Sequence, residues 1–248
     1  MSGFIDIHNH LLPGVDDGPK SMEQSINMLR IAYAEGIRTI IATPHYQEGR
    51  YMVSKVALEQ KLTEVITAAE KAGIPMDIFL GCEIYYSHEC VRLLKEKVIP
   101  TMAGTKYVLV EFMPLADSRY IKNALQEILL EGFRPILAHI ERYEALTKDY
   151  AFIEDLLDLG VYTQVNATSL TGESGKSLRL FTKKLLKNNM VQFVATDAHN
   201  EMKRVPKIKK CYEILRKKYG EVYAGELLRE NQINLFPLTA VLLRREGD

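Results

Sequence analysis

The 248-residue sequence contains only three cysteines, and they lie far apart, at Cys82, Cys90 and Cys211. An odd number with no Cys-x-x-Cys pair favours neither a disulfide framework nor a cysteine-based zinc or redox site. None of the three has an arginine six positions later, which excludes the thiolate phosphatase signature and its phosphocysteine intermediate. We therefore expect three buried thiols in a reducing compartment.

The sequence also lacks a net charge and a long apolar run. Lys plus Arg and Asp plus Glu both number 32, so no global field favours nucleic acid or an anionic membrane. Residues 1–9 do not combine a basic segment with an apolar run, and no later stretch is long and apolar enough to span a bilayer. We expect a cytoplasmic protein with no nucleic-acid partner and no membrane insertion.

Short apolar runs alternate along the chain with segments of helical period, and Gly36, Gly73 and Gly132 stand where helices are expected to end. One domain over residues 1–248 with parallel strands follows, either closed into a barrel or open as a doubly wound sheet. The seven runs that predict strands cover residues 4–7, 39–42, 77–81, 107–110, 134–138, 161–165 and 191–195.

Histidines and acidic residues follow six of these predicted strands, at the carboxyl ends where parallel α/β folds gather catalytic groups. Because side chains alternate along a strand, His8 and His10 at the end of the first run lie on the same side of the chain. Only the sixth run, which ends in Gln164-Val165-Asn166, lacks a strong metal ligand. The residues at the other ends are His45, Glu83, Glu111, His139, Asp197 and His199.

A single histidine at a strand end is more often a hydrogen-bonded structural residue than a ligand. Here five of the six histidines fall at such ends together with several carboxylates, which are costly to bury unless cations neutralise them. The set predicts a metal centre, whereas His88 lies beyond its strand end and is expected to face solvent. Imidazole and carboxylate ligands without a thiolate suit Mn, Fe or Zn.

The ordered motifs resemble the polymerase-and-histidinol-phosphatase superfamily from residue 4 to about residue 205. Within it, residues 15–21 and 139–143 look like the manganese-dependent protein-tyrosine phosphatases of bacterial capsule and exopolysaccharide loci. The motifs that carry the resemblance are Asp6-x-His8-x-His10, Asp16-Asp17-Gly18, Thr43-Pro44-His45, Glu83-Ile84-Tyr85-Tyr86, Glu111-Phe112, His139-Ile140-Glu141-Arg142-Tyr143 and Asp197-x-His199-Asn200.

This resemblance implies a distorted seven-stranded β/α barrel that carries three metal ions, Mn²⁺ in the first instance, at the carboxyl ends of its strands. It implies a phosphotyrosine protein as substrate, namely the tyrosine-rich tail of a bacterial tyrosine kinase. Glu83 would bridge two of the ions. The implied ligand sets are His8, His10, Glu83 and Asp197 for one ion, Asp17, His45 and His199 for a second, and Glu83, Glu111 and His139 for a third.

Adjacent cations bind phosphoryl oxygens and lower the pKa of a bridging water, so that hydroxide attacks phosphorus in line. Arg142 lies three residues beyond His139, and Arg204 five beyond His199, so we expect both guanidinium groups to bind the phosphate. His199 or Asp197 is the candidate proton donor, with neither preferred. The loop that follows His45, with Tyr46, Arg50 and Tyr51, either lines the entrance or faces solvent.

Several alternatives remain beside the tyrosine phosphatase. A small-molecule phosphatase such as a histidinol-phosphatase is the first, and a non-catalytic module of the same fold is the second. An amidohydrolase is disfavoured because Asn166 stands where that pattern expects a histidine. Residues 172–177 look like a P-loop, but Leu170 replaces the required first glycine, so we interpret them as a turn.

Overall fold

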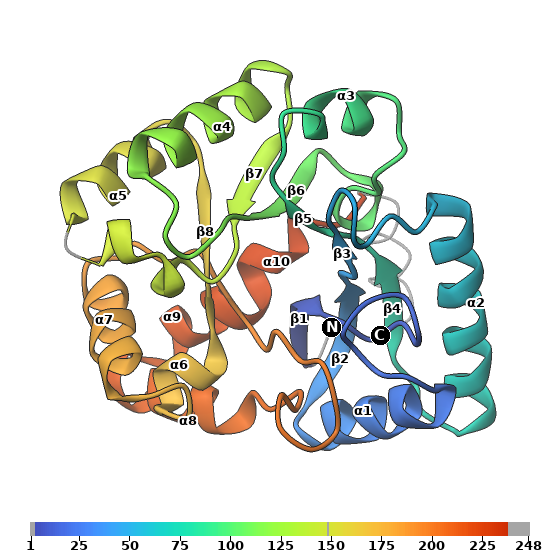
Figure 1. Ribbon diagram of the computed structural model, residues 1–248. Coiled ribbons are helices and arrows are strands. Elements are labelled where there is room, and N and C mark those ends of the chain that lie inside the picture. Colours follow the sequence, from blue (N-terminus) through green and yellow to red (C-terminus); the bar gives the residue numbers. More distant parts are fainter. Residues whose placement is uncertain (1–2, 148, 238–248) are drawn as a thin grey trace.

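The computed structural model describes residues 3–147 and 149–237. Within these ranges all strand pairs are parallel, and the strands curl around a common centre with most of the helices outside them (Figure 1). One sheet has the order β1 (Phe4–Asn9), β2 (Ile37–Ala42), β4 (Asp77–Leu80). The other has the order β3 (His45–Tyr46), β5 (Glu83–Tyr85), β6 (Tyr107–Glu111), β7 (Arg134–Leu137), β8 (Tyr162–Asn166), β9 (Phe193–Ala195).

All seven predicted runs contain a strand, but the prediction of one seven-stranded barrel is wrong, because the curled sheet has six strands beside a separate sheet of three. The second and third predicted strands are each interrupted, and their continuations are the short strands β3 and β5. Pro44 lies in the first interruption and has no N–H for the ladder. At Gly81 in the second, a Cβ would lie 2.8 Å from the Ile41 side chain. The chain therefore changes sheets at both places.

Three helices end where the sequence predicts. Gly36, Gly73 and Gly132 have φ angles of 90°, 68° and 83° just beyond α1, α2 and α4, a conformation that glycine adopts without steric cost. No helix in the described part of the chain is long and apolar enough to cross a membrane. The helices are α1 (Met22–Ala34), α2 (Lys55–Lys71), α3 (Cys90–Lys95), α4 (Ser118–Leu130), α5 (Tyr150–Asp158), α6 (Ala167–Thr171), α7 (Lys176–Lys187), α8 (Lys209–Tyr219), α9 (Glu221–Gly225) and α10 (Asn231–Ile233), with short turns η1 (Met102–Gly104), η2 (Ile140–Arg142), η3 (Glu144–Leu146) and η4 (Glu226–Glu230).

The apolar core has two parts, because alternate side chains of each strand face opposite sides of the sheet. The larger part lies between the strands and the surrounding helices. The smaller part fills the space inside the curl, where Ile5, Ile7 and Leu109 pack with Phe193. Phe236, from the segment after α10, packs into this inner part as well. The amino ends of the strands are thus covered, and the carboxyl ends stay available for a site.

Backbone hydrogen bonds join the end of β1 to the segment after β9. The Asp197 N–H donates to the His8 carbonyl at 2.8 Å, and the His10 N–H donates to the Ala198 carbonyl at 2.8 Å. These bonds bring residues 189 and 188 positions apart in the sequence side by side. They place the first and last predicted ligand pairs at one point of the fold.

Candidate metal centre

β1 and the residue after it supply two fully buried imidazoles, His8 and His10, whose Nε2 atoms lie 3.3 Å apart. The Glu83 Oε2 atom lies 3.0 Å from the first of these nitrogens and 3.1 Å from the second. The Asp197 Oδ1 atom lies 3.4 and 3.6 Å from them. One ligand atom from each of the four residues lies within 4.8 Å of the others, which is the arrangement that a single metal ion needs.

Three of the ligand atoms at the centre are buried and have no hydrogen bond of normal geometry. They are Glu83 Oε2, Asp197 Oδ1 and His199 Nε2. A buried polar atom without a partner costs free energy, and a carboxylate oxygen costs more than a neutral group. A cation bound between these atoms would supply the partner that each of them lacks, so the residues present fit a metal ion.

A second group of ligand atoms lies on the solvent side of the first. Atoms of His10, Asp17, His45 and His199 lie within 4.8 Å of one another. The His199 Nε2 atom is 3.3 Å from Asp17 Oδ1, and the His45 Nε2 atom is 3.5 Å from the same oxygen. The structure therefore brings together the three residues expected for a second ion and adds His10 to them.

A third group contains His45, Glu83 and Glu111. His139, which the resemblance assigns to this ion, lies beside the group, with Nε2 2.8 Å from Glu83 Oε1 and 3.6 Å from Glu111 Oε2. All nine residues expected as ligands thus meet at one site. Glu83 belongs to two of the groups, as its expected bridging role requires.

Two of the expected ligands have strained backbones. His139 has a φ of 32° and Asp197 a φ of 54°, in the left-handed region that residues other than glycine rarely adopt. Such conformations persist where the surrounding structure holds them, and they cluster at functional sites. Each turns a side chain at a strand end toward the centre.

In the metal-free protein the charges of the centre raise the pKa values of His8, His10 and His45, whereas the pKa of His199 is lowered. Although burial lowers the pKa of His10, the neighbouring Asp16 carboxylate raises it to about 9. Burial also lowers the pKa of His45, but its hydrogen bond to Glu111 and the charge of Glu83 raise it to about 9. Burial and the charge of His10 lower the pKa of His199 to about 4.

The same charges act on the carboxyl groups. Burial alone would raise the pKa of Glu83, but the charge of His8 and hydrogen bonds from three histidines hold it well below the usual range. Burial would likewise raise the pKa of Asp197, which His8, Arg142 and Arg204 hold well below the usual range. The centre therefore presents carboxylates throughout the neutral pH range, and these are ready to bind cations.

Both predicted arginines reach the centre. Arg142, at the end of η2, places NH2 2.8 Å from Asp197 Oδ2, and Arg204 places NH2 2.5 Å from Asp197 Oδ1. They line a cavity of about 210 Å³ with Lys203, Thr168 and Ser174. The two guanidinium groups thus converge on the Asp197 carboxylate at the metal groups.

Sequence reasoning missed the residues that hold the ligands from behind. The Nδ1 atom of His10 lies 2.8 Å from Asp16 Oδ2, which also accepts from the His45 backbone N–H at 3.0 Å. The buried Asp6 carboxylate accepts from the Thr196 hydroxyl at 2.6 Å. Both aspartates stand in quoted motifs, and their places one residue before Asp17 and two before His8 were the available signal.

The loop after β3 lies beside the centre. The Tyr51 ring stacks on the His45 imidazole, with 5.6 Å between centroids and 12° between planes, and the Arg50 guanidinium lies 4.8 Å from the Tyr51 ring. For Tyr51 the geometry supports a place beside the centre, whereas Tyr46 belongs to β3 and is buried, so the expectation of a loop residue is wrong for Tyr46. His88 is exposed and outside the centre, as the sequence predicts.

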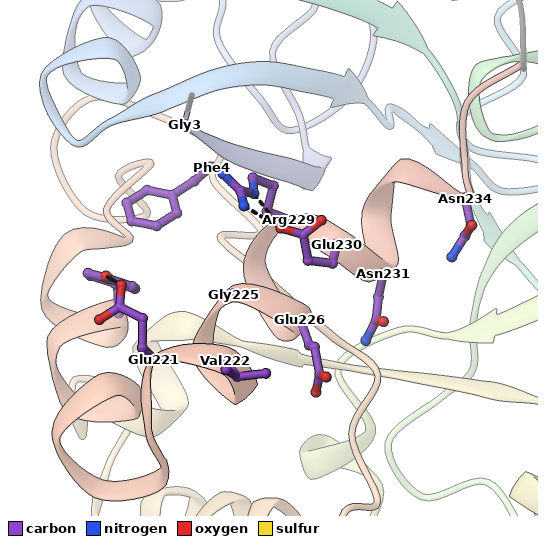
Figure 2. Close-up of a pocket in the computed structure, with 11 residues that line it drawn as sticks. Gly3, Phe4, Glu221, Val222, Gly225, Glu226, Arg229, Glu230, Asn231 and Asn234 are labelled. Atoms are coloured by element: carbon purple, nitrogen blue, oxygen red, sulfur yellow. Dashed lines mark hydrogen bonds and ion pairs between the residues drawn. The ribbon is translucent and has the colours of Figure 1, made fainter. Parts of the chain in front are cut away.

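A larger cavity, of about 800 Å³, lies at the opposite end of the fold (Figure 2). Gly3 and Phe4 at the amino end of β1 line it, together with side chains from α8, α9 and η4. Some of its polar side chains are paired with one another: the Tyr212 hydroxyl donates to Glu221 at 2.5 Å, and Arg229 forms an ion pair with Glu230. No histidine or cysteine lines this cavity, so the chemistry points to the smaller site at the carboxyl ends.

A curled parallel sheet with histidines and carboxylates at the carboxyl ends of its strands defines a metal-binding hydrolase fold. The chain belongs to the family described as capsular polysaccharide synthesis, CpsB/CapC, whose model matches residues 4–237. It is 36% identical over 233 residues to the tyrosine-protein phosphatase CpsB of Streptococcus pneumoniae, a match that covers 92% of this chain and 96% of the relative. It is 34% identical over 235 residues to the tyrosine-protein phosphatase YwqE of Bacillus subtilis, covering 92% of each.

Solved structures agree with this assignment. One chain from a study of YwqE from Bacillus subtilis and CpsB from Streptococcus pneumoniae, described as unique metal-dependent tyrosine phosphatases, superposes with a TM-score of 0.88. It is 33% identical, and the match covers 93% of this chain and 94% of that one. The histidinol phosphate phosphatase of Lactococcus lactis, at 14% identity and a TM-score of 0.57, shares the fold.

Proposed function

We propose that this protein is a metal-dependent phosphatase that hydrolyses phosphotyrosine in proteins. The observation that carries the proposal is the convergence at one site of buried ligand atoms from Glu83, Asp197 and His199 that have no hydrogen bond of normal geometry. The family membership and the tyrosine phosphatases among the relatives support it. The link of the family to capsular polysaccharide synthesis supports a bacterial tyrosine kinase of that process as substrate.

We assign the nine converging residues as ligands of three ions, with Mn²⁺ as the metal. Imidazole nitrogens and carboxylate oxygens without thiolate support Mn²⁺, with Fe or Zn as substitutes. When bound, the ions supply positive charge for the phosphoryl oxygens and lower the pKa of a coordinated water. The three free, buried thiols of Cys82, Cys90 and Cys211 support a cytoplasmic location.

The protein's own side chains then have distinct tasks. Arg142 and Arg204 bind the phosphoryl oxygens with planar forks of donors, and they are already aimed at the centre by Asp197. Burial lowers the pKa of His199 to about 4, so at pH 7 it is a neutral imidazole without the acidic imidazolium proton that a general acid would give to the leaving group. Phenolate has a conjugate acid pKa of about 10 and therefore leaves with less acid assistance than an alkoxide, which suits a site without a ready general acid.

The test compares three substrates with one preparation of enzyme: a phosphotyrosine peptide, the matching phosphoserine peptide and histidinol phosphate. We expect Mn²⁺-dependent turnover with a clear preference for phosphotyrosine, loss of activity in a strong chelator, and better recovery with Mn²⁺ than with Mg²⁺. A preference for histidinol phosphate would assign the small-molecule activity instead. Full activity in chelator, with metal absent by elemental analysis, would refute the mechanism.

A further inference from the structure

β8 contributes no expected ligand, yet two of its side chains face the centre. Gln164 and Asn166 lie two residues apart on one face of the strand, and both are buried, with 0% and 1% of their surface exposed. Amides buried to this degree are costly unless every donor and acceptor finds a partner. Their partners are members of the centre itself.

The two amides form a continuous hydrogen-bonded chain. The Gln164 Oε1 atom accepts from the backbone N–H of His139 at 2.9 Å and lies 3.1 Å from His8 Nδ1. The Gln164 Nε2 group donates to Asn166 Oδ1 at 2.8 Å. The Asn166 Nδ2 group donates to Asp197 Oδ2 at 2.8 Å. Three of the expected ligands are therefore tied together from behind.

The direction of every bond in this chain is fixed by its two ends. A backbone N–H can only donate, so the Gln164 atom that faces His139 is the carbonyl oxygen. An ionised carboxylate can only accept, so the Asn166 atom that faces Asp197 is the amino group. The central bond, from the Gln164 amino group to the Asn166 oxygen, agrees with both assignments.

This direction decides the state of His8. Since Gln164 Oε1 can only accept, the Nδ1 atom of His8 carries its proton toward that oxygen. In the neutral imidazole that binds metal, the Nε2 atom then offers its lone pair, and it is the nitrogen that lies 3.0 Å from Glu83 Oε2 and 3.4 Å from Asp197 Oδ1. A partner on the far nitrogen that fixes tautomer and ring orientation is the usual companion of a ligating histidine.

We propose that Gln164 and Asn166 are positioning residues that preorganise His8, His139 and Asp197 for metal. Amides suit this task better than carboxylates because each one accepts at one end and donates at the other, so a single chain serves several ligands. They also add no negative charge behind Asp197 and Glu83. The inference rests on the metal centre of the proposed function and goes beyond it in assigning the role of β8.

The test measures the affinity for Mn²⁺ without substrate, together with the metal-free melting temperature. Gln164→Met keeps the volume and removes both hydrogen-bonding groups, and we expect it to bind Mn²⁺ about 10- to 100-fold more weakly, as is typical of lost outer partners. Gln164→Glu keeps the acceptor for His8 and His139, but it replaces the donor to Asn166 by a charged oxygen, so its affinity should fall between that of Gln164→Met and wild type.

Thr163→Val is the matched control. Thr163 is buried on the same strand, but its hydroxyl donates to the Met190 carbonyl at 2.6 Å, away from the centre. Its loss should lower the melting temperature and leave the Mn²⁺ affinity unchanged. If a folded Gln164→Met protein binds Mn²⁺ as tightly as wild type, the inference is wrong, while the proposed function stands. If Gln164→Met does not fold, the same result in Gln164→Glu leads to the same conclusion. A wild-type protein that binds no Mn²⁺ would overturn the proposed function as well.

Discussion

The centre has a buried half and an open half, and the two are built differently. His8, His10, Glu83 and Asp197 are 2% exposed or less, and they come from the ends of β1 and β5 and the turn after β9. In the open half, the Asp17 side chain is 48% exposed and that of Glu111 16%. Because electrostatic interactions strengthen as water is excluded, the same ligand type holds a cation more strongly in the first half than in the second.

The support behind the two halves differs as well. In the buried half, His8 has Gln164 behind it and His10 has Asp16, so the ring orientations are fixed before metal arrives. Asp17 has no comparable support, since its closest partners are the imidazoles of the centre itself. We infer that the buried half is preformed, and that the open half is where the substrate exchanges with solvent.

The largest effect that tests this comparison is expected at Glu83. Glu83→Ala should lose more than one metal per chain, because its carboxylate belongs to two ligand groups, and the fall in kcat/KM should exceed the roughly 10–100-fold typical of outer partners. Asp17→Asn, in the open half, should lose at most one metal and less activity. Metal per chain by elemental analysis and kcat/KM give both answers.

Glu127→Ala is the control for these substitutions, since this glutamate on α4 accepts from Tyr86 and lies outside the centre. It should keep the full metal content. A full metal complement in Glu83→Ala would disprove the bridging role, and a greater metal loss in Asp17→Asn than in Glu83→Ala would reverse the comparison between the two halves.

Arg142 offers a smaller effect at the boundary between the halves. Arg142→Ala should keep metal and fold but lower kcat/KM about ten- to a hundredfold, which corresponds to one charge-assisted contact of roughly 1.5–3 kcal/mol. Arg142→Lys should keep part of the activity that Arg142→Ala loses, because an ammonium supplies the charge but lacks the planar pair of guanidinium donors. Arg134→Ala, at the amino end of β7, is the control and should spare turnover.

The opposite outcome at Arg142 is equally measurable. Its guanidinium contacts Asp197 at 2.8 Å, so a purely structural ion pair is the competing explanation. In that case Arg142→Ala would lower the melting temperature and leave kcat/KM of the folded, metal-loaded protein near normal. Such a result would remove Arg142 from substrate binding.

The sequence predicted the strand positions and the metal ligands, but it did not predict how the strands divide into two sheets. Strand positions and the convergence of His8 and His199 follow from local periodicity and from the shared end of parallel strands, both of which are written in short segments. The division into sheets of three and six strands depends instead on breaks at Pro44 and Gly81, whose effect on pairing appears only when neighbouring strands are in place.

The hydrogen-bond partners behind the ligands, such as Gln164, could not be predicted from the sequence for a related reason. Gln164 contacts His8 across 156 positions, and nothing local distinguishes it from any other glutamine near a strand end. The backbone strain at His139 likewise depends on what surrounds it. Ligands can be recognised by residue type, whereas the residues behind them are recognised only by the geometry of their hydrogen bonds.

The last prediction is a pH dependence with opposite signs for stability and metal affinity. In the metal-free protein the pKa values of His10 and His45 are raised from 6.5 to about 9, so the stability they contribute is fully present below 6.5 and is lost as the pH rises through 9. Over this window the unfolding free energy should fall, by at most about 1.4 kcal/mol per pH unit for each imidazole. Mn²⁺ affinity should rise, because the ligands must lose their protons.

Denaturant unfolding and metal titration between pH 6.5 and 9 measure the two trends. Asp16→Asn removes the charge that raises the pKa of His10 and should flatten the first trend, whereas an unchanged slope in that variant would refute the assignment.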